Sequence, residues 1–402
     1  MDLVDWSMCL KTYNRILLTS LLMGSINFIN ANENILSENK LEIIDYSYQK
    51  AIEDSSKLSK DWINPITYKY IYNNGENYDT QKSFISISQP IFKSGGIYSA
   101  IKYASSMDKY SKTSIDTQKK ELIKQALNLL FQIHKIDITI KKQKLLVDNG
   151  ILDVNRKKEQ VMNGILDSSF LDNSIIDLNT KKNSLIDLEY QKIQLINSFS
   201  NISDKEYSSL ELPTLSLATQ EKFIENNIYI KKQKEDIDNS YWIKRMTTAS
   251  YLPTINLTAD HTKYHETDGG LQYQDATNYG FNITIPLDIK YSNQIQSTKI
   301  AYLQKKASLK DQEIQELNIY KNSIAKIDSL DKKIEIAKSD VKLYDSLLTQ
   351  IKEQLTVGLK TVSDVQTMEN SKEIKAWDIK SLNIEKQIEL LEIYSRYMEH
   401  NG

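Results

Sequence analysis

The chain has 402 residues, and its 51 lysines and arginines nearly balance its 53 aspartates and glutamates, for a formal net charge of −2. No sustained basic run is present, which argues against a nucleic-acid partner. With 11 glycines and 5 prolines the chain is punctuated too rarely for many short elements, so long elements are expected.

The N-terminus reads as a signal peptide covering residues 1–31. If Met8 is the working start, Lys11 and Arg15 form a basic region, "ILLTSLLMGSINFI" is the apolar region, and Ala31 suits cleavage. The competing interpretation is a short buried helix of a cytosolic protein. The only cysteine, Cys9, would leave with the signal, which excludes disulfides and cysteine catalysis in the mature chain.

The sequence after residue 31 predicts a first structural repeat over residues 32–203. It begins with a helix over about 33–60, followed by strands at 64–73 and 83–92 that carry prolines near their ends. A long helix then runs to Met162, and a return helix spans about 169–199. No segment has the ~18 consecutive apolar residues of a membrane-spanning helix, so entry into a membrane would require strands.

A connector at 204–217, with serines, Pro213 and no period, separates this repeat from a second one over 218–402. The second repeat has a helix, strands at 252–264 and 278–290, and another long helical hairpin. Pro90 and Pro286 lie 196 residues apart in matching strands. The second strand alternates apolar and polar residues over eleven positions, which is typical of a strand with two different faces.

The helical stretches carry apolar residues in steps of three and four, as coiled coils do. The first run is Ala126, Leu129, Ile133, Ile136 and Ile140, and the second is Val341, Tyr344, Leu348, Ile351 and Leu355. A helix over residues 97–162 would extend about 100 Å, beyond the span of a compact domain.

Gly358 and Gly164 lie 194 residues apart and predict the turns of two antiparallel helix hairpins, with tips near 163–168 and 357–362. Ser168 or Ser169 in the first hairpin, and Thr361 or Ser363 in the second, are candidate caps for the return helices. The alternative is a tolerated glycine inside a helix. Gly150 has a tyrosine, Tyr344, at the equivalent position and is interpreted as a weak point inside a helix.

The strands are long enough to cross an outer membrane, and tyrosines such as Tyr68, Tyr70 and Tyr279 would suit its interfaces. Tyrosines on a water-exposed sheet are the alternative. Four strands cannot close a barrel, because known outer-membrane barrels have at least about eight, so several chains would have to share one.

These features resemble one known family. The duplicated order, the strand "YLPTINLTADHTKY", the strand-to-helix transitions "QPIFKSGGIYSA" and "IPLDIKYSNQIQSTKIA", and above all the hairpin "VGLKTVSDVQTMENS" look like the TolC-like outer-membrane efflux proteins. The resemblance implies a mainly α fold with a small membrane β part. It also implies a homotrimer whose twelve-stranded β-barrel continues into a long α-helical coiled-coil tunnel, located in the outer membrane and extending into the periplasm.

The same resemblance implies the partners and the site residues. A periplasmic adaptor would contact the hairpin tips, and an inner-membrane pump or exporter would complete the route. The tip residues are Gly164, Ile165, Leu166, Val357, Gly358, Leu359, Lys360 and Thr361. Asp364 matches the acidic residue that the family places at the periplasmic mouth. Phe170 and Thr367 occupy positions where a more acidic gate would carry further charge.

Other candidate chemistry is weaker. His261 and His265 are four residues apart in strand or loop text, where a metal pair is not favoured over solvated histidines. No nucleotide-binding or nucleophile-elbow motif is present, so we expect neither an enzyme nor a cofactor. The sequence thus predicts an outer-membrane channel of a tripartite efflux or type I secretion system that gives substrates passive exit. A periplasmic coiled-coil scaffold without a channel is the alternative, and the substrate stays open.

Overall fold

The computed structural model describes residues 35–74, 79–267 and 274–397. The expected signal peptide lies outside the described residues, as do parts of both strand-connecting loops. The chain forms two compact units. The first, called the helical unit, comprises the described residues within 35–42, 119–226 and 320–397. The second, called the sheet unit, comprises Ile43–Gln118 and Asn227–Ile319.

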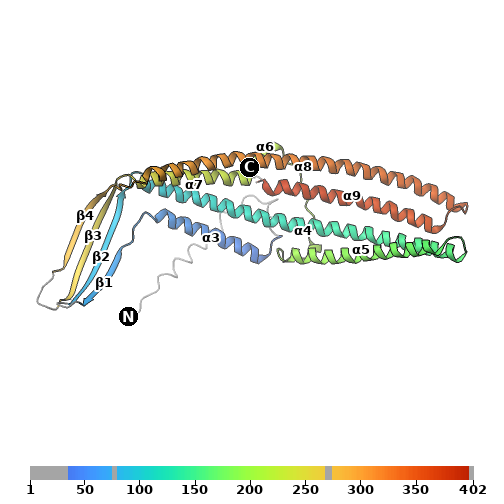
Figure 1. The fold of residues 1–402 in the computed structure, drawn as a ribbon, viewed down its shortest axis with the longest axis horizontal. Helices are drawn as coiled ribbons and strands as arrows, with labels where there is room; N and C mark the ends of the chain where they lie inside the picture. Colours follow the sequence, from blue (N-terminus) through green and yellow to red (C-terminus); the bar gives the residue numbers. More distant parts are fainter. Residues whose placement is uncertain (1–34, 75–78, 268–273, 398–402) are drawn as a thin grey trace. The chain divides into compact units, whose positions relative to one another are not determined.

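The sheet unit contains one antiparallel sheet in the order β1-β2-β3-β4 (Figure 1). Its strands are β1 (Thr67–Asn74), β2 (Asp79–Phe92), β3 (Thr254–Thr267) and β4 (Ala276–Thr284). β1 pairs with β2 and β3 with β4, each with its neighbour in the chain. The central pair, β2 with β3, joins segments that are far apart in the sequence, so the sheet links the two strand pairs into one surface.

The strand ends differ from the expected ones for identifiable reasons. β1 begins at Thr67 instead of Asn64, because Pro65 has no N–H to donate and the backbone N–H of Asn64 is bound by Gln89 Oε1 at 2.9 Å. β2 begins at Asp79 instead of Ser83, because its ladder with β3 continues beyond that point. Strand pairing toward the loops is therefore longer than the alternation of residues indicated.

The last strand, expected over 278–290, is instead β4 over Ala276–Thr284. Thr284 pairs with Thr254, the residue directly after Pro253, and Pro286 follows two residues later. Neither proline can donate a ladder hydrogen bond, so pairing stops here. The alternating apolar residues continue past the strand, and Leu287 and Ile289 are almost completely exposed.

Two helices of equal length accompany the sheet unit, α3 (Glu38–Lys60) and α7 (Ile228–Ser250). Asn227 caps α7, since its side chain accepts hydrogen bonds from the N–H groups of Tyr229 and Ile230. Buried polar contacts hold the helices of this unit together. Ser106 Oγ donates to Asn239 Oδ1 at 2.7 Å, and Asn227 Nδ2 donates to Glu316 Oε2 at 2.9 Å.

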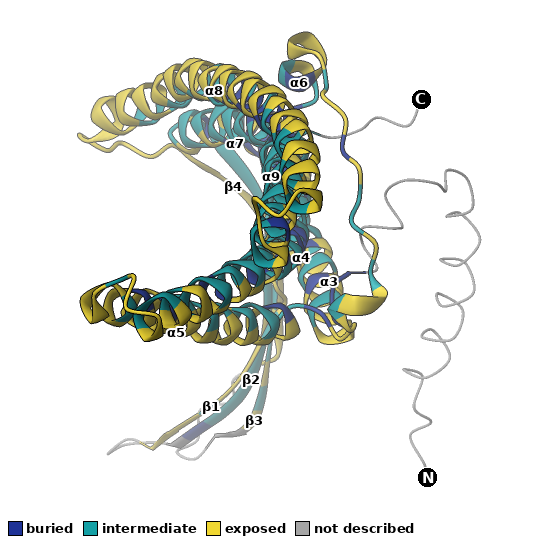
Figure 2. Ribbon diagram, turned by 90° about the vertical axis from the view of Figure 1, so that its right-hand side faces the viewer, coloured by how far each residue is buried: buried dark blue, intermediate teal, exposed yellow. Residues whose placement is uncertain are grey.

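The helical unit is built from α4 (Gly96–Met162), α5 (Ser168–Ser200), α8 (Tyr291–Thr356) and α9 (Val362–Arg396), with α4 and α8 contributing one portion to each unit. The helices of this unit form a row in which α5 lies beside α4, α4 beside α9, and α9 beside α8 (Figures 1 and 2). Among the described residues, none of the helices combines the length and the apolar composition needed to cross a membrane.

The core of the helical unit is apolar and lies between these helices. Its most buried side chains, each no more than 2% exposed, include Ala126, Leu127, Leu130, Phe131, Ile133, Phe199, Phe223, Leu330, Leu391 and Ile393. The expected heptad positions on α4 behave accordingly, since Ala126, Ile133, Ile136 and Ile140 are buried. The corresponding run from Val341 to Leu355 on α8 is half-buried, so the second hairpin is less enclosed near its tip.

The connector between the strand-and-hairpin segments packs on the helical unit. It contains a short 3-10 turn, η1 (Tyr207–Ser209), and leads into α6 (Gln220–Glu225). The N–H of Leu215 donates to Gln387 Oε1 at 2.7 Å, and the Tyr320 hydroxyl donates to the carbonyl of Ala218 at 2.8 Å. The rings of Phe223 and Tyr320 are 5.2 Å apart, so this segment is anchored by both polar and aromatic contacts.

Candidate functional site

The sheet has two chemically different faces. Pairing places one set of side chains together because directly opposed residues point to the same side. This mainly apolar face carries Tyr68, Tyr70, Tyr72, Ile85, Ile87, Ile255, Leu257, Ala259, Tyr279, Phe281 and Ile283, and with them the polar residues Gln81, Ser83, Gln89, His261, Lys263 and Thr277. Tyr279 is 81% exposed and Phe281 72%, so the face is open. A large exposed apolar surface of this kind indicates contact with lipid or with another protein.

The opposite face of the sheet is polar. It carries mainly hydroxyl and amide side chains, namely Thr67, Asn73, Ser86, Ser88, Asn256, Thr258, Thr262, Asn278, Asn282 and Thr284. Asn278 donates to Asp260 at 2.9 Å, and Asn256 donates to Asn282 at the same distance. An apolar face backed by a polar one is the pattern of a strand that separates lipid from water.

The two outer strands of the sheet have one open edge each. Within the described residues, β1 pairs only with β2 and β4 pairs only with β3. The backbone N–H and C=O groups on the outer sides of β1 and β4 are therefore available for further strands.

The hairpin tips share one backbone geometry. Gly164 has a φ of 70° and Gly358 a φ of 76°, in the left-handed region that favours glycine. After α4, the N–H groups of Gly164 and Ile165 donate to the carbonyls of Val161 and Gln160. After α8, those of Gly358 and Leu359 donate to Leu355 and Gln354 in the same way. Both turns are thus Schellman motifs.

The return helices begin with different caps. Thr361 caps α9 and forms a capping box with Asp364, in which each side chain binds the other's backbone N–H. The expectation of a serine cap on α5 is wrong, because Asp167 is the N-cap and accepts from the N–H of Ser169 at 2.8 Å. A carboxylate accepts this bond as well as a hydroxyl does, and it adds favourable charge at the helix N-terminus.

Asp364 makes contacts to two helices. Its Oδ2 accepts from the N–H and the hydroxyl of Thr361, each at 3.0 Å, and its Oδ1 lies 3.5 Å from Arg156 Nη1 of α4. The backbone hydrogen bond from Thr361, with smaller help from the charges of Lys360 and Arg156, lowers the pKa of Asp364 below its ordinary value. Asp364 is therefore a firmly ionised carboxylate near the tip of the second hairpin.

Arg156 was missed by the sequence reasoning. Its Nη2 lies 2.5 Å from Asp153 Oδ1, and Lys157 binds the other oxygen of Asp153 at 2.8 Å. Burial opposes the ionisation of Asp153, but hydrogen bonds from Lys157 and Arg156 outweigh it and lower the pKa. The signal that could have found Arg156 is its spacing, one heptad beyond Asn149 and two beyond Lys142 on α4.

The other expected gate residues lie apart from this cluster. Phe170, at the position equivalent to Asp364, is 52% exposed in the first turn of α5. Thr367 uses its hydroxyl to donate to the carbonyl of Ser363 within α9, at 2.8 Å. The structure therefore brings Asp364 together with Arg156 and Thr361, and not with Phe170.

Apolar side chains are exposed at both hairpin tips. Ile165 is 72% exposed, Val357 69% and Leu359 74%, and Lys360 is exposed beside them. Leu166 is the exception among the expected tip contacts, since it is half-buried. Apolar side chains at this exposure suit a protein partner better than water.

A ladder of polar contacts joins the first hairpin to the second. It runs between α4 and α9, with bases mostly on α4 and acids on α9, and its α4 members are seven residues apart from Lys135 to Arg156. Its pairs are Lys124–Glu392, Lys135–Glu385, Lys142–Asp378, Asn149–Asn370 and Arg156–Asp364. Lys141 also lies 4.7 Å from the ring centre of Trp377. Because antiparallel helices keep one register along such a ladder, it aligns the two hairpins from core to tip.

The histidines singled out in the sequence take part in ordinary sheet contacts. His261 Nδ1 lies 2.8 Å from Thr277 Oγ1, and His265 Nε2 lies 2.6 Å from Ser83 Oγ. No cluster of three or more metal-ligating side chains occurs in the part of the chain that the structure describes. His134 lies on α4, where burial lowers its pKa against the opposing charge of Asp137.

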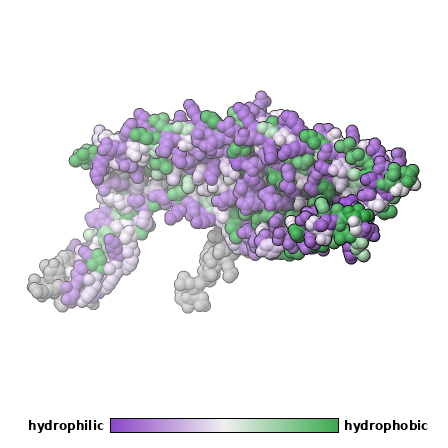
Figure 3. Space-filling view, turned by 45° about the vertical axis from the view of Figure 1, so that its right-hand side comes forward, coloured by the Kyte–Doolittle hydropathy of each residue, from purple (hydrophilic) through white to green (hydrophobic). Residues whose placement is uncertain are grey.

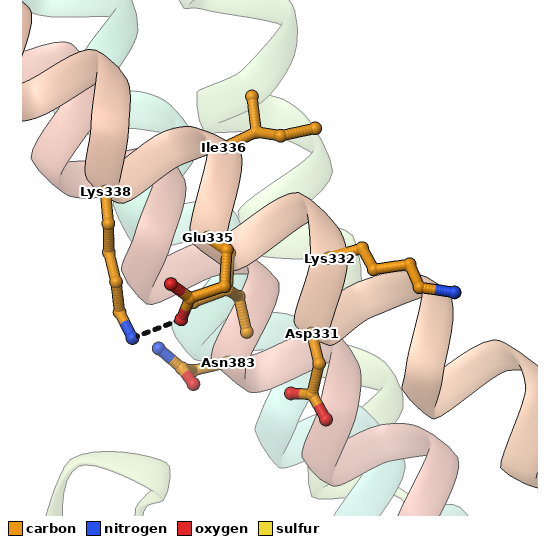
Figure 4. Close-up of a pocket in the computed structure, with 7 residues that line it drawn as sticks. Asp331, Lys332, Glu335, Ile336, Lys338 and Asn383 are labelled. Atoms are coloured by element: carbon orange, nitrogen blue, oxygen red, sulfur yellow. Dashed lines mark hydrogen bonds and ion pairs between the residues drawn. The ribbon is translucent and has the colours of Figure 1, made fainter.

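A shallow groove of about 570 Å³ runs along α8 beside Asn383 of α9 (Figure 4). Its charged side chains are engaged with one another or with neighbours, since Lys338 binds Glu335 at 2.8 Å and Asp331 binds Lys386 at 2.6 Å. Ile336 projects from α8 away from these groups (Figure 4). The groove has the chemistry of a solvated helix surface.

Comparisons with known proteins confirm the resemblance inferred from the sequence. Residues 225–373 match the model of a family described as outer membrane efflux protein. A search of curated proteins by sequence found no match. The matching family and the matched structures below are described as efflux proteins, outer membrane proteins and channels, and not as enzymes.

Solved structures share the fold along most of the chain. The CmeC outer membrane channel of Campylobacter jejuni superimposes with a TM-score of 0.74 at 10% identity, covering 92% of this chain and 86% of that one. VceC, an outer membrane protein of Vibrio cholerae, gives 0.70 at 13% identity, covering 92% and 96%. The open state of the Neisseria gonorrhoeae MtrE outer membrane channel gives 0.67 at 12%, covering 91% and 88%. The mainly helical fold with a small sheet is that of outer membrane channels.

Proposed function

We propose that this chain, which resembles the outer membrane efflux proteins over residues 225–373 and has the fold of outer membrane channels, is the channel component of a tripartite efflux or type I secretion system. It resides in the outer membrane, extends into the periplasm, and gives substrates passive exit across both. The energy for transport comes from the partner pump.

One observation carries this proposal: the exposed two-faced sheet with an open edge on each side. In a bilayer the apolar face meets lipid and the polar face lines a water-filled lumen. An unpaired edge in lipid costs several kcal/mol for each backbone group left without a partner, so the sheet must be closed by further copies. A homotrimer supplies twelve strands, enough for a closed barrel.

The hairpins extend the barrel as a coiled-coil tunnel in the periplasm. A periplasmic adaptor binds their tips, and an inner-membrane pump or exporter delivers the substrate. The exposed apolar side chains of Ile165, Val357 and Leu359, together with Lys360, support the tips as the adaptor contact.

Asp364 forms the gate at the periplasmic mouth. Three symmetry copies place an acidic ring there, which favours cations. The contact to Arg156 holds α9 beside α4 at the tip. The same carboxylate therefore supplies the negative charge of the gate and joins the two helices that form it. The gate opens when this contact separates, and the uncharged side chains of Phe170 and Thr367 add no charge to it.

Single-channel conductance in a planar bilayer tests the proposal. The unmodified protein should give small, cation-selective openings. Asp364→Asn should give larger or more frequent openings with weaker cation selectivity, because it removes the acidic charge and the contact to Arg156. The matched control is Asp167→Asn at the other tip, which keeps a capping side chain and removes one carboxylate outside the proposed gate.

The outcomes separate channel from gate. Conductance that is the same in both variants and in the unmodified protein would remove the gate role of Asp364 but keep the channel. Absence of any conductance, with protein that is extracted from membranes without detergent, would replace the channel by a periplasmic coiled-coil scaffold.

A further inference from the structure

The polar face of the sheet carries positive charge toward the loops that connect its strands. Among the described side chains of this face, the charged ones are Lys69 of β1, Lys82 of β2 and Asp260 of β3. We propose that Lys69 and Lys82 form a binding site for the anionic groups, phosphate or carboxylate, of solutes that pass through the lumen. This inference rests on the proposed function, and it adds a site whose charge is opposite to that of Asp364.

The strand register brings the two lysines together. Lys69 lies opposite Phe84, and Lys82 lies opposite Ile71 and Tyr264. Because alternate residues of a strand point to the same side, Lys82 shares its face with Phe84 and therefore with Lys69. The lysines thus occupy diagonal positions of the β1·β2 ladder, which are about 7–8 Å apart. Two flexible ammonium groups at this separation can reach the same phosphate or carboxylate group.

Neither lysine has an acidic partner within the part of the chain that the structure describes. Lys82 is half-buried, and its Nζ lies 5.9 Å from the ring centre of Tyr264. The nearby carboxylates are engaged elsewhere, since Asp260 accepts from Asn278 at 2.9 Å and Asp275 accepts from the backbone N–H of Tyr264 at 3.0 Å. An ammonium group that is partly removed from water without a counter-charge favours the binding of an anion.

The lysines of the helices differ in this respect. Along α4, Lys124 binds Glu392 at 2.6 Å and Lys135 binds Glu385 at 2.8 Å. An ion pair neutralises each of these charges, so they offer little to a passing solute. The charges of the two lysines on the sheet are not neutralised in this way.

The surroundings of the two lysines suit a hydrated solute. A shallow hollow of about 370 Å³ on the polar face is lined by Phe84, the residue opposite Lys69, and by hydroxyl side chains that include Thr67, Ser86 and Thr258. Most strand residues visible in Figure 3 are hydrophilic or neutral, in keeping with a sheet that has one polar face. The hydroxyl groups can donate to oxygen atoms of a solute whose anionic group is held by the lysines.

The apolar face also carries a lysine at this level of the sheet. Lys263 is exposed, and it lies opposite Ser83, the residue that follows Lys82. In the proposed channel Lys263 lies on the side of the barrel that meets lipid, and a solute in the lumen does not reach it. Lys263 therefore differs from Lys82 in the face that it occupies and not in its charge.

The proposed channel thus has two charged sites of opposite sign. Asp364 favours cations at the periplasmic mouth, whereas the copies of Lys69 and Lys82 around the lumen favour anions toward the strand-connecting loops. Rings of charged side chains are a common means by which pores select ions. A solute with an anionic group is consequently held at the outer end of the lumen after it has passed the mouth.

Block of the single-channel current by a multivalent anion tests this site. In about 0.1 M KCl, where charges act over about 10 Å, tripolyphosphate should reduce the current of the unmodified protein, and more strongly from one side of the bilayer than from the other. Lys69→Gln with Lys82→Gln should raise the half-blocking concentration about tenfold or more, because the loss of one hydrogen bond to a charged group corresponds to about this factor.

Matched variants separate the site from general effects of charge. Lys263→Gln removes the same charge from the other face and should leave the block unchanged. Lys69→Arg with Lys82→Arg keeps both charges and should retain the block. Citrate should block as well, because a lysine binds as a point charge and does not require the geometry of phosphate. In about 1 M KCl the block should weaken, because the range of the charges falls to about 3 Å.

The outcomes distinguish the anion site from the channel. Equal block of the unmodified protein and of Lys69→Gln with Lys82→Gln would overturn the site, and so would an equal loss of block in Lys263→Gln. The current without a blocker would leave the channel intact in both cases. If the double variant does not conduct, each single variant gives the same comparison with a smaller shift. Absence of conductance in the unmodified protein would overturn the channel and the site with it.

Discussion

The two helical hairpins turn in the same way but are completed with different chemistry. Both close through a glycine with positive φ and the same pair of backbone hydrogen bonds. After the turn, α5 places its carboxylate at the cap, Asp167, whereas α9 places it three positions into the helix, Asp364. The turn requires one backbone conformation. A carboxylate, in contrast, is favourable at any of several positions in the first turn of a helix, because the helix N-terminus is partly positive.

The sides of the hairpins differ as well. The contact between α4 and α9 is a charged ladder, whereas α8 and α5 expose apolar side chains such as Ile336 on α8 and Ile176 on α5. Duplication thus preserved the backbone and changed the surface. Equivalent positions in a repeat can therefore have different roles when one of them is covered by another helix of the same chain and the other is exposed.

Gly150 provides the sharpest contrast between the hairpins, since its counterpart is Tyr344. A Cβ at Gly150 would lie 3.1 Å from Leu178 Cδ1 of α5, so the glycine permits close packing of α4 on α5. Gly150 does lie inside a helix, as expected, and its lack of a side chain also allows Leu178 to approach α4 closely. Gly150→Phe should destabilise the protein by about 1–3 kcal/mol, more than the ~0.5 kcal/mol that helix propensity returns.

Thermal unfolding followed by circular dichroism checks this expectation. The matched change in the other hairpin is Tyr344→Phe, which keeps the ring and should alter stability by less than about 0.5 kcal/mol. Equal melting temperatures for Gly150→Phe and the unmodified protein would mean that α5 can move away from α4 at no cost.

The caps give a smaller effect. Thr361→Ala removes the side chain that caps α9 and its half of the capping box, and should cost about 1 kcal/mol. Ser169→Ala should cost almost nothing, because Asp167 and not Ser169 caps α5. Urea unfolding midpoints of the two variants distinguish them, and a larger loss from Ser169→Ala would contradict the assignment of the caps.

The smallest expected effect concerns the charged ladder, which should make the stability of the folded protein depend on pH. Burial opposes the ionisation of Glu392, but Lys124 and Arg396 outweigh it, so the pKa of Glu392 lies below its ordinary 4.5, and that of Asp364 lies below 3.8. A lowered pKa stabilises the folded state above the ordinary value, and this contribution is lost as the pH falls below it. Each pair should contribute at most about 1 kcal/mol.

Urea midpoints at neutral pH and at pH values below 4.5 measure this loss. The double variant Asp364→Asn, Glu392→Gln should start from a lower midpoint and lose less of it on acidification. An identical pH dependence in the double variant would assign the acid sensitivity to other carboxylates. High salt should also narrow the difference, because these pairs are partly exposed.

Much of the architecture could be predicted from local patterns. Rare glycines and prolines, heptad spacing and the alternation around Phe281 are signals that a few neighbouring residues carry, and they act through backbone geometry. The turns at Gly164 and Gly358 belong to the same class, because a positive φ is a local requirement. The resemblance to outer-membrane efflux proteins rested on such local sequence patterns, and the comparisons with known proteins confirmed it.

Other features depended on residues far apart in the chain. The end of β4 at Thr284 followed from its pairing with Thr254, and the role of Gly150 from the approach of Leu178. The partner of Asp364 is Arg156, which lies on another helix, so no short stretch of the sequence could indicate this contact.

The sequence by itself determined the duplicated order, the long helices and their turns, because each follows from backbone preferences over a few residues. The tertiary structure alone decided which helix sides meet and which remain open, because side-chain pairing across helices depends on a register that only packing sets. The fold could therefore be predicted from the sequence, whereas the charged ladder and the exposed sides of α5 and α8 could not.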